Sequence, residues 1–112
     1  TALARLLRDR LVSNDAEAYI ASCEAVAGID LREGNRHLAL PTLVIAGTQD
    51  EATPPAMSEA IAEAIPGAQL ATLDAAHLSA VEQPAQFAAL VTAFWRGLEA
   101  GRPASDQATR AA

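Results

Sequence analysis

The chain has 112 residues, of which 51% are hydrophobic and 20% charged; this composition is typical of one globular domain or part of one and argues against a disordered segment. Its net charge of −6 disfavours binding to nucleic acid or to anionic membranes. Cys23 is the only cysteine, so no internal disulfide can form, and no signal peptide or apolar run of ~18 residues is present. We therefore expect a cytoplasmic protein without a membrane span.

The first third of the chain predicts helices. Apolar residues recur at helical spacing from Thr1 with no capping residue before them, so we expect the chain to begin inside a helix of a longer protein. A second helix is predicted after an N-cap at Asn14 or Asp15, with Gly28 as the residue just past its end. Tyr19 and Cys23 lie on its apolar stripe, where they are either buried or line a pocket.

Two short apolar runs predict parallel strands joined by a helix. After a short helix over residues 31–35, the runs are Thr42–Ala46 and Ala68–Leu73. The helix between them begins at Pro54-Pro55, with a predicted apolar stripe made by Met57, Ala60, Ile61, Ala64 and Ile65. Because two parallel strands do not form a stable sheet alone, we expect an upstream part of the protein, or another copy, to complete the sheet.

The last helix is predicted from Pro84 to residue 100, after a loop that starts at Asp74. Its expected buried stripe consists of Phe87, Leu90, Val91, Phe94, Trp95 and Leu98. Residues 101–112 are predicted to be a flexible tail.

An acid and a histidine follow the two predicted strands. Asp50 comes shortly after the first strand and His77 shortly after the second. Functional groups gather at the carboxyl ends of parallel strands, and a carboxylate there can orient an imidazole that acts as a general base. Taken alone, each residue also has a non-catalytic interpretation: Asp50 as a cap of the helix that begins at Pro54-Pro55, and His77 as a surface loop residue or a cap. Asp74 is a second possible acid, and His37 carries little weight.

The rest of a catalytic site is not found in this sequence. No serine stands in a Gly-x-Ser-x-Gly turn, the setting of a strand-to-helix nucleophile. The two histidines, His37 and His77, share no spacing that suggests a metal site, and no glycine-rich phosphate loop is present. We therefore predict no metal and no cofactor.

Three segments resemble the last third of an α/β-hydrolase. They are Leu43–Pro55 (Leu-Val-Ile-Ala-Gly-Thr-Gln-Asp-Glu-Ala-Thr-Pro-Pro), Ile65–Leu70 (Ile-Pro-Gly-Ala-Gln-Leu) and Asp74–Ser79 (Asp-Ala-Ala-His-Leu-Ser). Within that superfamily the chain is most similar to the 3-oxoadipate enol-lactonases, through Thr-Pro-Pro after the acid, His-Leu-Ser, and a helix with Tyr19 and Cys23 that resembles the end of their lid.

The resemblance implies an α/β fold in three parts. Residues 1–29 would be the end of a helical lid, residues 30–100 the C-terminal βαβα part of the core with its last two parallel strands, and residues 101–112 the tail. Asp50 matches the triad acid and His77 the general base, while Tyr19 and Cys23, on the lid-like helix, are candidates for contact with substrate.

The implied reaction is hydrolysis of a small-molecule ester or lactone by a serine upstream of this chain. The best-matched family implies 3-oxoadipate enol-lactone, from aromatic-compound breakdown, as the substrate. The chain alone would be inactive. Two alternatives stay open: a truncated, non-catalytic interaction module, or another α/β-hydrolase activity such as a haloperoxidase-like or carbon–carbon hydrolase.

Overall fold

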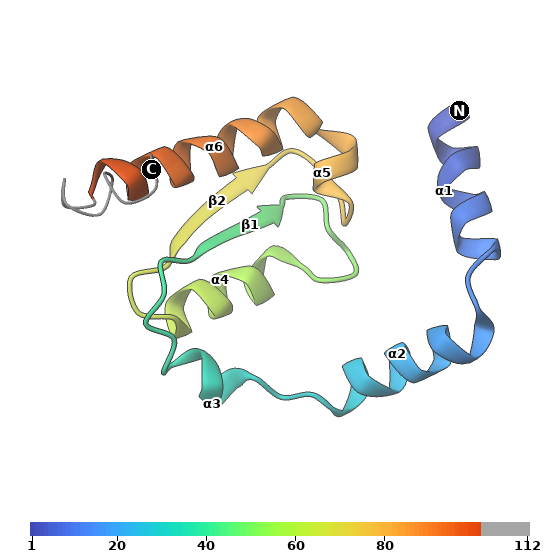
Figure 1. Cartoon of the computed structure of the whole chain (residues 1–112), viewed down its shortest axis with the longest axis horizontal. Helices are drawn as coiled ribbons and strands as arrows, with labels where there is room; N and C mark the ends of the chain where they lie inside the picture. The colour runs from blue at the N-terminus through green and yellow to red at the C-terminus, as the bar shows by residue number, and fades with distance from the viewer. Residues whose placement is uncertain (102–112) are drawn as a thin grey trace, which may run out of the picture. The chain divides into compact units, whose positions relative to one another are not determined.

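The computed structural model describes residues 1–101 and divides into two compact units, Thr1–Leu31 and a second unit that begins at Arg32. The elements are α1 (Ala2–Val12), α2 (Ala16–Gly28), α3 (Arg32–Asn35), β1 (Leu43–Gly47), α4 (Pro55–Ala64), β2 (Gln69–Leu73), α5 (Ser79–Glu82) and α6 (Pro84–Ala100) (Figure 1). Apart from Gly101, the predicted flexible tail lies outside the described residues.

The first unit consists of α1 and α2. The start of α1 and the end of α2 differ from the predictions. Thr1 caps α1, because its hydroxyl oxygen accepts a hydrogen bond from the Ala4 amide at 3.1 Å. Asp15 caps α2 in the same way through Ala18, at 2.8 Å. Gly28 is the last residue of α2 and not the residue beyond it; the chain leaves the helix through an extended Ile29, so no left-handed glycine turn is formed.

The second unit is built on a parallel pair of strands, as predicted. β1 and β2 pair in a register that runs from Leu43 beside Gln69 to Gly47 beside Leu73. The ladder continues past the strands, where the Thr48 amide donates to the Leu73 carbonyl at 2.9 Å. Within residues 1–101, β1 pairs with β2 alone, so its other edge is open.

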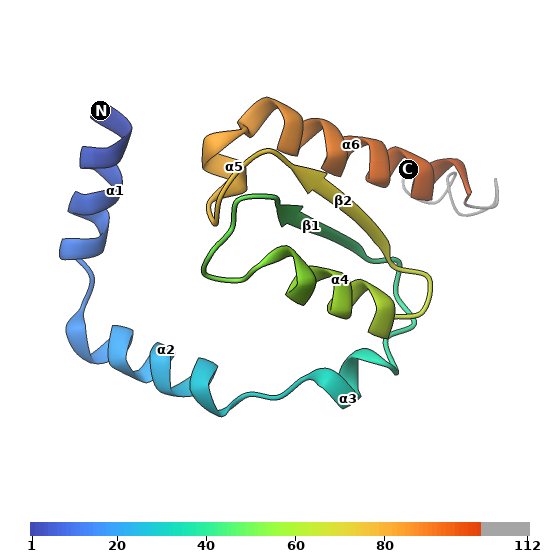
Figure 2. The same cartoon turned by 180° about the vertical axis from the view of Figure 1, so that it is seen from behind.

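Helices cover the two faces of this sheet. α4 packs against β1 and β2, and α6 lies on the opposite side against β2 (Figures 1 and 2). Proline occupies the first turn of both helices, at Pro55 and Pro84, where its missing amide hydrogen costs nothing. Gly67 reverses the chain after α4 with a φ of +74°, a conformation that other residues adopt with strain.

The buried apolar side chains lie in the strands and in the segments next to them. In the described part of the chain they are Ala46, Ile65, Leu73 and Ala75. The helix predicted from the apolar spacing is present as α4, and three of its apolar positions, Met57, Ala60 and Ile61, are exposed. Small half-buried residues, Ser58 and Ala62, take their place and suit a helix lying close to the sheet.

The stripe of α6 is wider in the sequence than the face that the sheet covers. Phe87, Leu90, Phe94 and Leu98 are half-buried, whereas Val91 and Trp95 are exposed and so correct the prediction. The Trp95 indole donates to Glu99 Oε1 at 3.2 Å. Helix α5 is a further correction, since this stretch was expected to be part of a loop.

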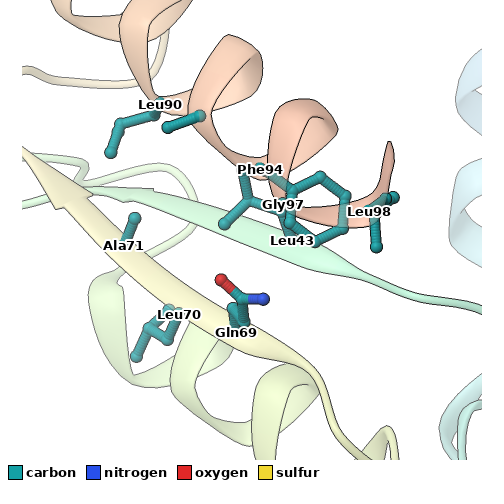
Figure 3. Close-up of a pocket in the computed structure, with 9 residues that line it drawn as sticks. Leu43, Gln69, Leu70, Ala71, Leu90, Phe94, Gly97 and Leu98 are labelled. Carbon is teal, nitrogen blue, oxygen red and sulfur yellow. The ribbon is translucent and has the colours of Figure 1, made fainter. Parts of the chain in front are cut away.

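An open groove of about 380 Å³ lies between α6 and the strands (Figure 3). Its lining residues are Leu43, Gln69, Leu70, Ala71, Leu90, Ala93, Phe94, Gly97 and Leu98. None of them belongs to the loops that follow β1 and β2, so the groove is separate from the predicted catalytic residues. No helix among residues 1–101 is long and apolar enough to cross a membrane.

Candidate active site

The parallel register brings Asp50 and His77 to one edge of the sheet. β1 and β2 end side by side at Gly47 and Leu73, and the two residues follow these ends by three and four positions. Their side chains meet there: His77 Nδ1 lies 2.9 Å from Asp50 Oδ2. The structure therefore joins two residues that the sequence could only place on neighbouring strand ends.

The Asp50 carboxylate is held by its own loop. Its Oδ1 accepts hydrogen bonds from the backbone amides of Ala52 and Thr53, both at 2.9 Å, and its Oδ2 accepts from the Thr53 hydroxyl at 2.8 Å. These donors favour the charged form. The Thr53 amide, followed by the contact with His77, holds the pKa of Asp50 well below its usual value. Asp50 is therefore an ionised acceptor at neutral pH, with a side chain only 9% exposed.

The contact with Asp50 determines which nitrogen of His77 carries a proton. An ionised carboxylate only accepts hydrogen bonds, so the proton of the 2.9 Å contact must sit on Nδ1. This assignment leaves Nε2 to take a proton from another group. The ring is 56% exposed and thus accessible to a partner.

Hydrogen bonds from outside the loop fix the backbone before His77. The Gln49 amide donates to the Ala75 carbonyl at 3.0 Å, and the Ala76 amide donates to Glu82 Oε2 at 3.0 Å. The Gln83 side-chain amide donates to the Asp74 carbonyl, also at 3.0 Å. Residues from both the β1 loop and helix α5 therefore hold the loop that carries His77.

Close packing at Gly47 brings the two loops together. A Cβ at this position would lie closer than 3.0 Å to the carbonyl oxygens of Ala75 and Ala76. These are backbone atoms next to His77 and cannot rotate away. Gly47 is therefore required for the approach of the His77 loop to the end of β1.

Asp74, the other possible acid, does not contact His77. Its Oδ1 accepts from the Thr48 hydroxyl at 3.4 Å and from the Gln49 side-chain amide. Asp74 therefore links the loop after β1 to the loop after β2, whereas Asp50 is the carboxylate that accepts the hydrogen bond from the His77 imidazole. His37 is bound elsewhere, with Nε2 3.2 Å from Glu33 Oε1.

Tyr19 and Cys23 both lie on α2 in the first unit. Tyr19 is exposed, and Cys23 is a free, exposed thiol, so the expectation that either is buried is wrong for this structure. Their contact with substrate stays a prediction. Within residues 1–101, no group of three or more His, Cys, Asp or Glu side chains could hold a metal ion.

Sequence reasoning missed the residues that support the pair. Thr53 stands three positions after Asp50, a spacing at which an aspartate commonly accepts local backbone hydrogen bonds, so this contact had a detectable signal. Glu82 and Gln83 had none, because their contacts depend on the unpredicted helix α5.

Comparisons with known proteins agree with this architecture. The α/β-hydrolase family model described as TAP-like protein matches residues 11–107. The chain is 42% identical over 77 residues to 3-oxoadipate enol-lactonase 2 of Acinetobacter baylyi, covering 69% of this chain and 29% of that protein. It is 33% identical over 97 residues to 3-oxoadipate enol-lactonase 1 of the same organism, covering 87% and 36%.

A solved structure extends the likeness to three dimensions. The crystal structure of the enol-lactonase from Burkholderia xenovorans LB400 superposes with a TM-score of 0.83 at 38% identity, covering 85% of this chain and 36% of that one. The chain thus spans about a third of the length of the relatives it matches. With its parallel βαβ unit, it belongs to the α/β-hydrolase superfamily and represents a C-terminal portion of that fold.

Proposed function

We propose that the protein carrying this chain is a serine hydrolase of esters or lactones, in which Asp50 orients the general base His77. The observation that carries the proposal is the 2.9 Å contact between Asp50 Oδ2 and His77 Nδ1 at the carboxyl ends of two parallel strands. The nucleophilic serine is proposed to lie upstream of this chain, on a Gly-x-Ser-x-Gly turn.

In the proposed mechanism, His77 Nε2 removes the proton of the serine hydroxyl as its oxygen attacks the substrate carbonyl. The imidazolium that forms is stabilised by the ionised Asp50, which keeps its negative charge throughout. The ring C–O bond of a lactone then breaks, and His77 returns the proton to the leaving oxygen. Water, deprotonated by His77 in turn, attacks the acyl-enzyme and releases the carboxylic acid product and the free serine.

The proposed substrate is 3-oxoadipate enol-lactone, which places the protein in aromatic-compound breakdown. Two relatives named 3-oxoadipate enol-lactonase match 69% and 87% of the chain. The sequence Thr-Pro-Pro after Asp50 and the sequence His-Leu-Ser that begins at His77 also resemble that family. We propose that Tyr19 and Cys23 belong to the lid that contacts this substrate. The leaving group is an enol, so the acyl product tautomerises to a ketone after release.

The test uses the complete protein with p-nitrophenyl acetate and with the enol-lactone. Replacing His77 by Ala should lower kcat by about 10³-fold or more, since the general base is lost. His37→Ala is the matched control, because that histidine pairs with Glu33 on α3, and its rate should stay within about twofold.

The outcomes separate the reaction from the substrate. An unchanged rate in His77→Ala would show that the hydrolase mechanism is wrong. Hydrolysis of p-nitrophenyl acetate without hydrolysis of the enol-lactone would contradict the substrate alone. We expect the isolated 112-residue chain to be inactive on both, because it contains no Gly-x-Ser-x-Gly turn.

A further inference from the structure

We propose that Thr53 is a positioning residue whose hydroxyl holds Asp50 and His77 in the one arrangement that leaves His77 Nε2 free to act as a base. This inference deepens the proposed function and rests on it. Thr53 itself need not touch substrate, because its effect passes through the carboxylate and the imidazole.

Three polar atoms meet at this point. The Thr53 hydroxyl oxygen lies 2.8 Å from Asp50 Oδ2 and 3.3 Å from His77 Nδ1, and the latter two atoms are 2.9 Å apart. Each of the three is thus within hydrogen-bond reach of the other two. The side chain of Thr53 closes a triangle between the acid and the histidine.

The protons in this triangle fit one tautomer of His77. With a proton on Nδ1, that N–H and the Thr53 O–H both donate to Oδ2, and a lone pair of the hydroxyl faces the same N–H. With the proton on Nε2, an Nδ1 lone pair would face a carboxylate oxygen at 2.9 Å with no hydrogen between them. Thr53 has one hydroxyl proton and cannot fill both contacts.

The hydroxyl is not needed to form the loop. The turn after Asp50 is made by the backbone amides of Ala52 and Thr53, which both donate to Oδ1. Valine keeps this amide and the branched shape of threonine while removing the hydroxyl, and serine keeps the hydroxyl. The pair Thr53→Val and Thr53→Ser therefore separates positioning from turn formation.

The experiment measures kcat, KM and the His77 tautomer in the complete protein. Thr53→Val should lower kcat about tenfold with KM within about twofold, corresponding to one lost hydrogen bond in the transition state. Thr53→Ser should restore kcat to within about threefold of the parent. The ¹⁵N shifts of the His77 ring should show the Nδ1–H tautomer in all three proteins, because Asp50 sets it. The Nδ1 proton should resonate far downfield in the parent and in Thr53→Ser, and should lose part of that shift in Thr53→Val, where the contact with Asp50 is looser.

Two results would overturn the inference. One is a Thr53→Val protein with parental kcat and an unchanged Nδ1 proton shift, while His77→Ala is inactive; the hydrolase proposal would then stand without a role for Thr53. The other is an equal loss in Thr53→Val and Thr53→Ser that follows a loss of thermal stability, which would make Thr53 a structural turn residue. Should His77→Ala stay active, the hydrolase proposal fails, and the Nδ1 proton shift still decides whether Thr53 positions His77 against Asp50.

Discussion

The loops after β1 and β2 are held in place in different ways. The Asp50 loop is stabilised locally: apart from His77, the donors to its carboxylate come from residues two and three positions along the chain, Ala52 and Thr53. The His77 loop depends on contacts from elsewhere, with Gln49 on one side and Glu82 and Gln83 on the other. The acid is organised by its neighbours in sequence, and the base by its neighbours in space.

This difference implies different sensitivities to mutation. Changes within the Asp50 loop should affect the charge and orientation of the acid while leaving the surrounding backbone intact. Changes around the His77 loop should move the imidazole itself, even when the altered residue lies far from it in sequence. Four predictions test the contrast, beginning with the largest effect.

The largest effect is expected from Asp50→Asn in the complete protein. An amide in place of the carboxylate neither stabilises imidazolium nor enforces the Nδ1–H tautomer, so kcat should fall by about 10³–10⁴-fold. Asp74→Asn is the matched control, because Asp74 contacts Thr48 and Gln49 and not His77. Its kcat should stay within about threefold. A larger loss of kcat in Asp74→Asn than in Asp50→Asn would identify Asp74 as the acid.

Gly47→Ala should have the next largest effect, about 100-fold in kcat/KM. The added methyl group collides with the Ala75 and Ala76 carbonyl groups and displaces the His77 loop by a fraction of an ångström or more. Gly34→Ala is the control, since nothing lies within 4 Å of a Cβ at that position. The kcat/KM of Gly47→Ala and of Gly34→Ala is measured with the same substrate. Equal values in the two variants would contradict the packing argument.

Glu82→Ala should lower kcat/KM by about three- to tenfold. It removes the acceptor of the Ala76 amide, and one hydrogen bond to a charged group is worth about 1 kcal/mol at an accessible site. Glu82→Gln keeps an oxygen that accepts this hydrogen bond and should stay near the parental value. If Gln is as damaging as Ala, the charge of Glu82 and not its hydrogen bond is responsible.

The smallest effect at neutral pH comes from the titration of Asp50. Its pKa in the folded chain is depressed, mainly by the Thr53 amide and His77, so its ionised form stabilises the fold. That contribution is complete above the ordinary pKa of about 4 and is lost as the pH falls toward the folded value. Urea unfolding of the complete protein and of its Asp50→Asn variant at about pH 7, 5 and 3 should give a difference that is no smaller at pH 5 than at pH 7 and that falls at pH 3. A difference that shrinks already between pH 7 and 5 would contradict the assignment.

The sequence predicted the sheet and the edge that carries Asp50 and His77, because these depend on local signals. The apolar runs around Val44 and Leu70, set apart by proline and glycine, specify two strands, and the helix between them makes the strands parallel. Asp50 and His77 then follow from their places after the strand ends. The superfamily was predicted correctly from the same segments.

What the sequence did not reveal depends on three-dimensional packing. Trp95 has the apolar character of its half-buried neighbours, but the sheet covers a narrower face of α6 than the sequence pattern suggests. Helix α5 is only four residues long, too short for a helical period to be recognised. The role of Glu82 depends on that helix, and so it could not be predicted.

The register of the sheet has a consequence for insertions and deletions. One residue along a strand corresponds to about 3.3 Å, more than the whole 2.9 Å contact between His77 and Asp50. A residue added after Leu73 would therefore separate the pair, whereas a residue added at the exposed turn of Pro66 and Gly67 lies at the other end of the strands. Chain length should thus vary freely at one end of this sheet and be held constant at the other.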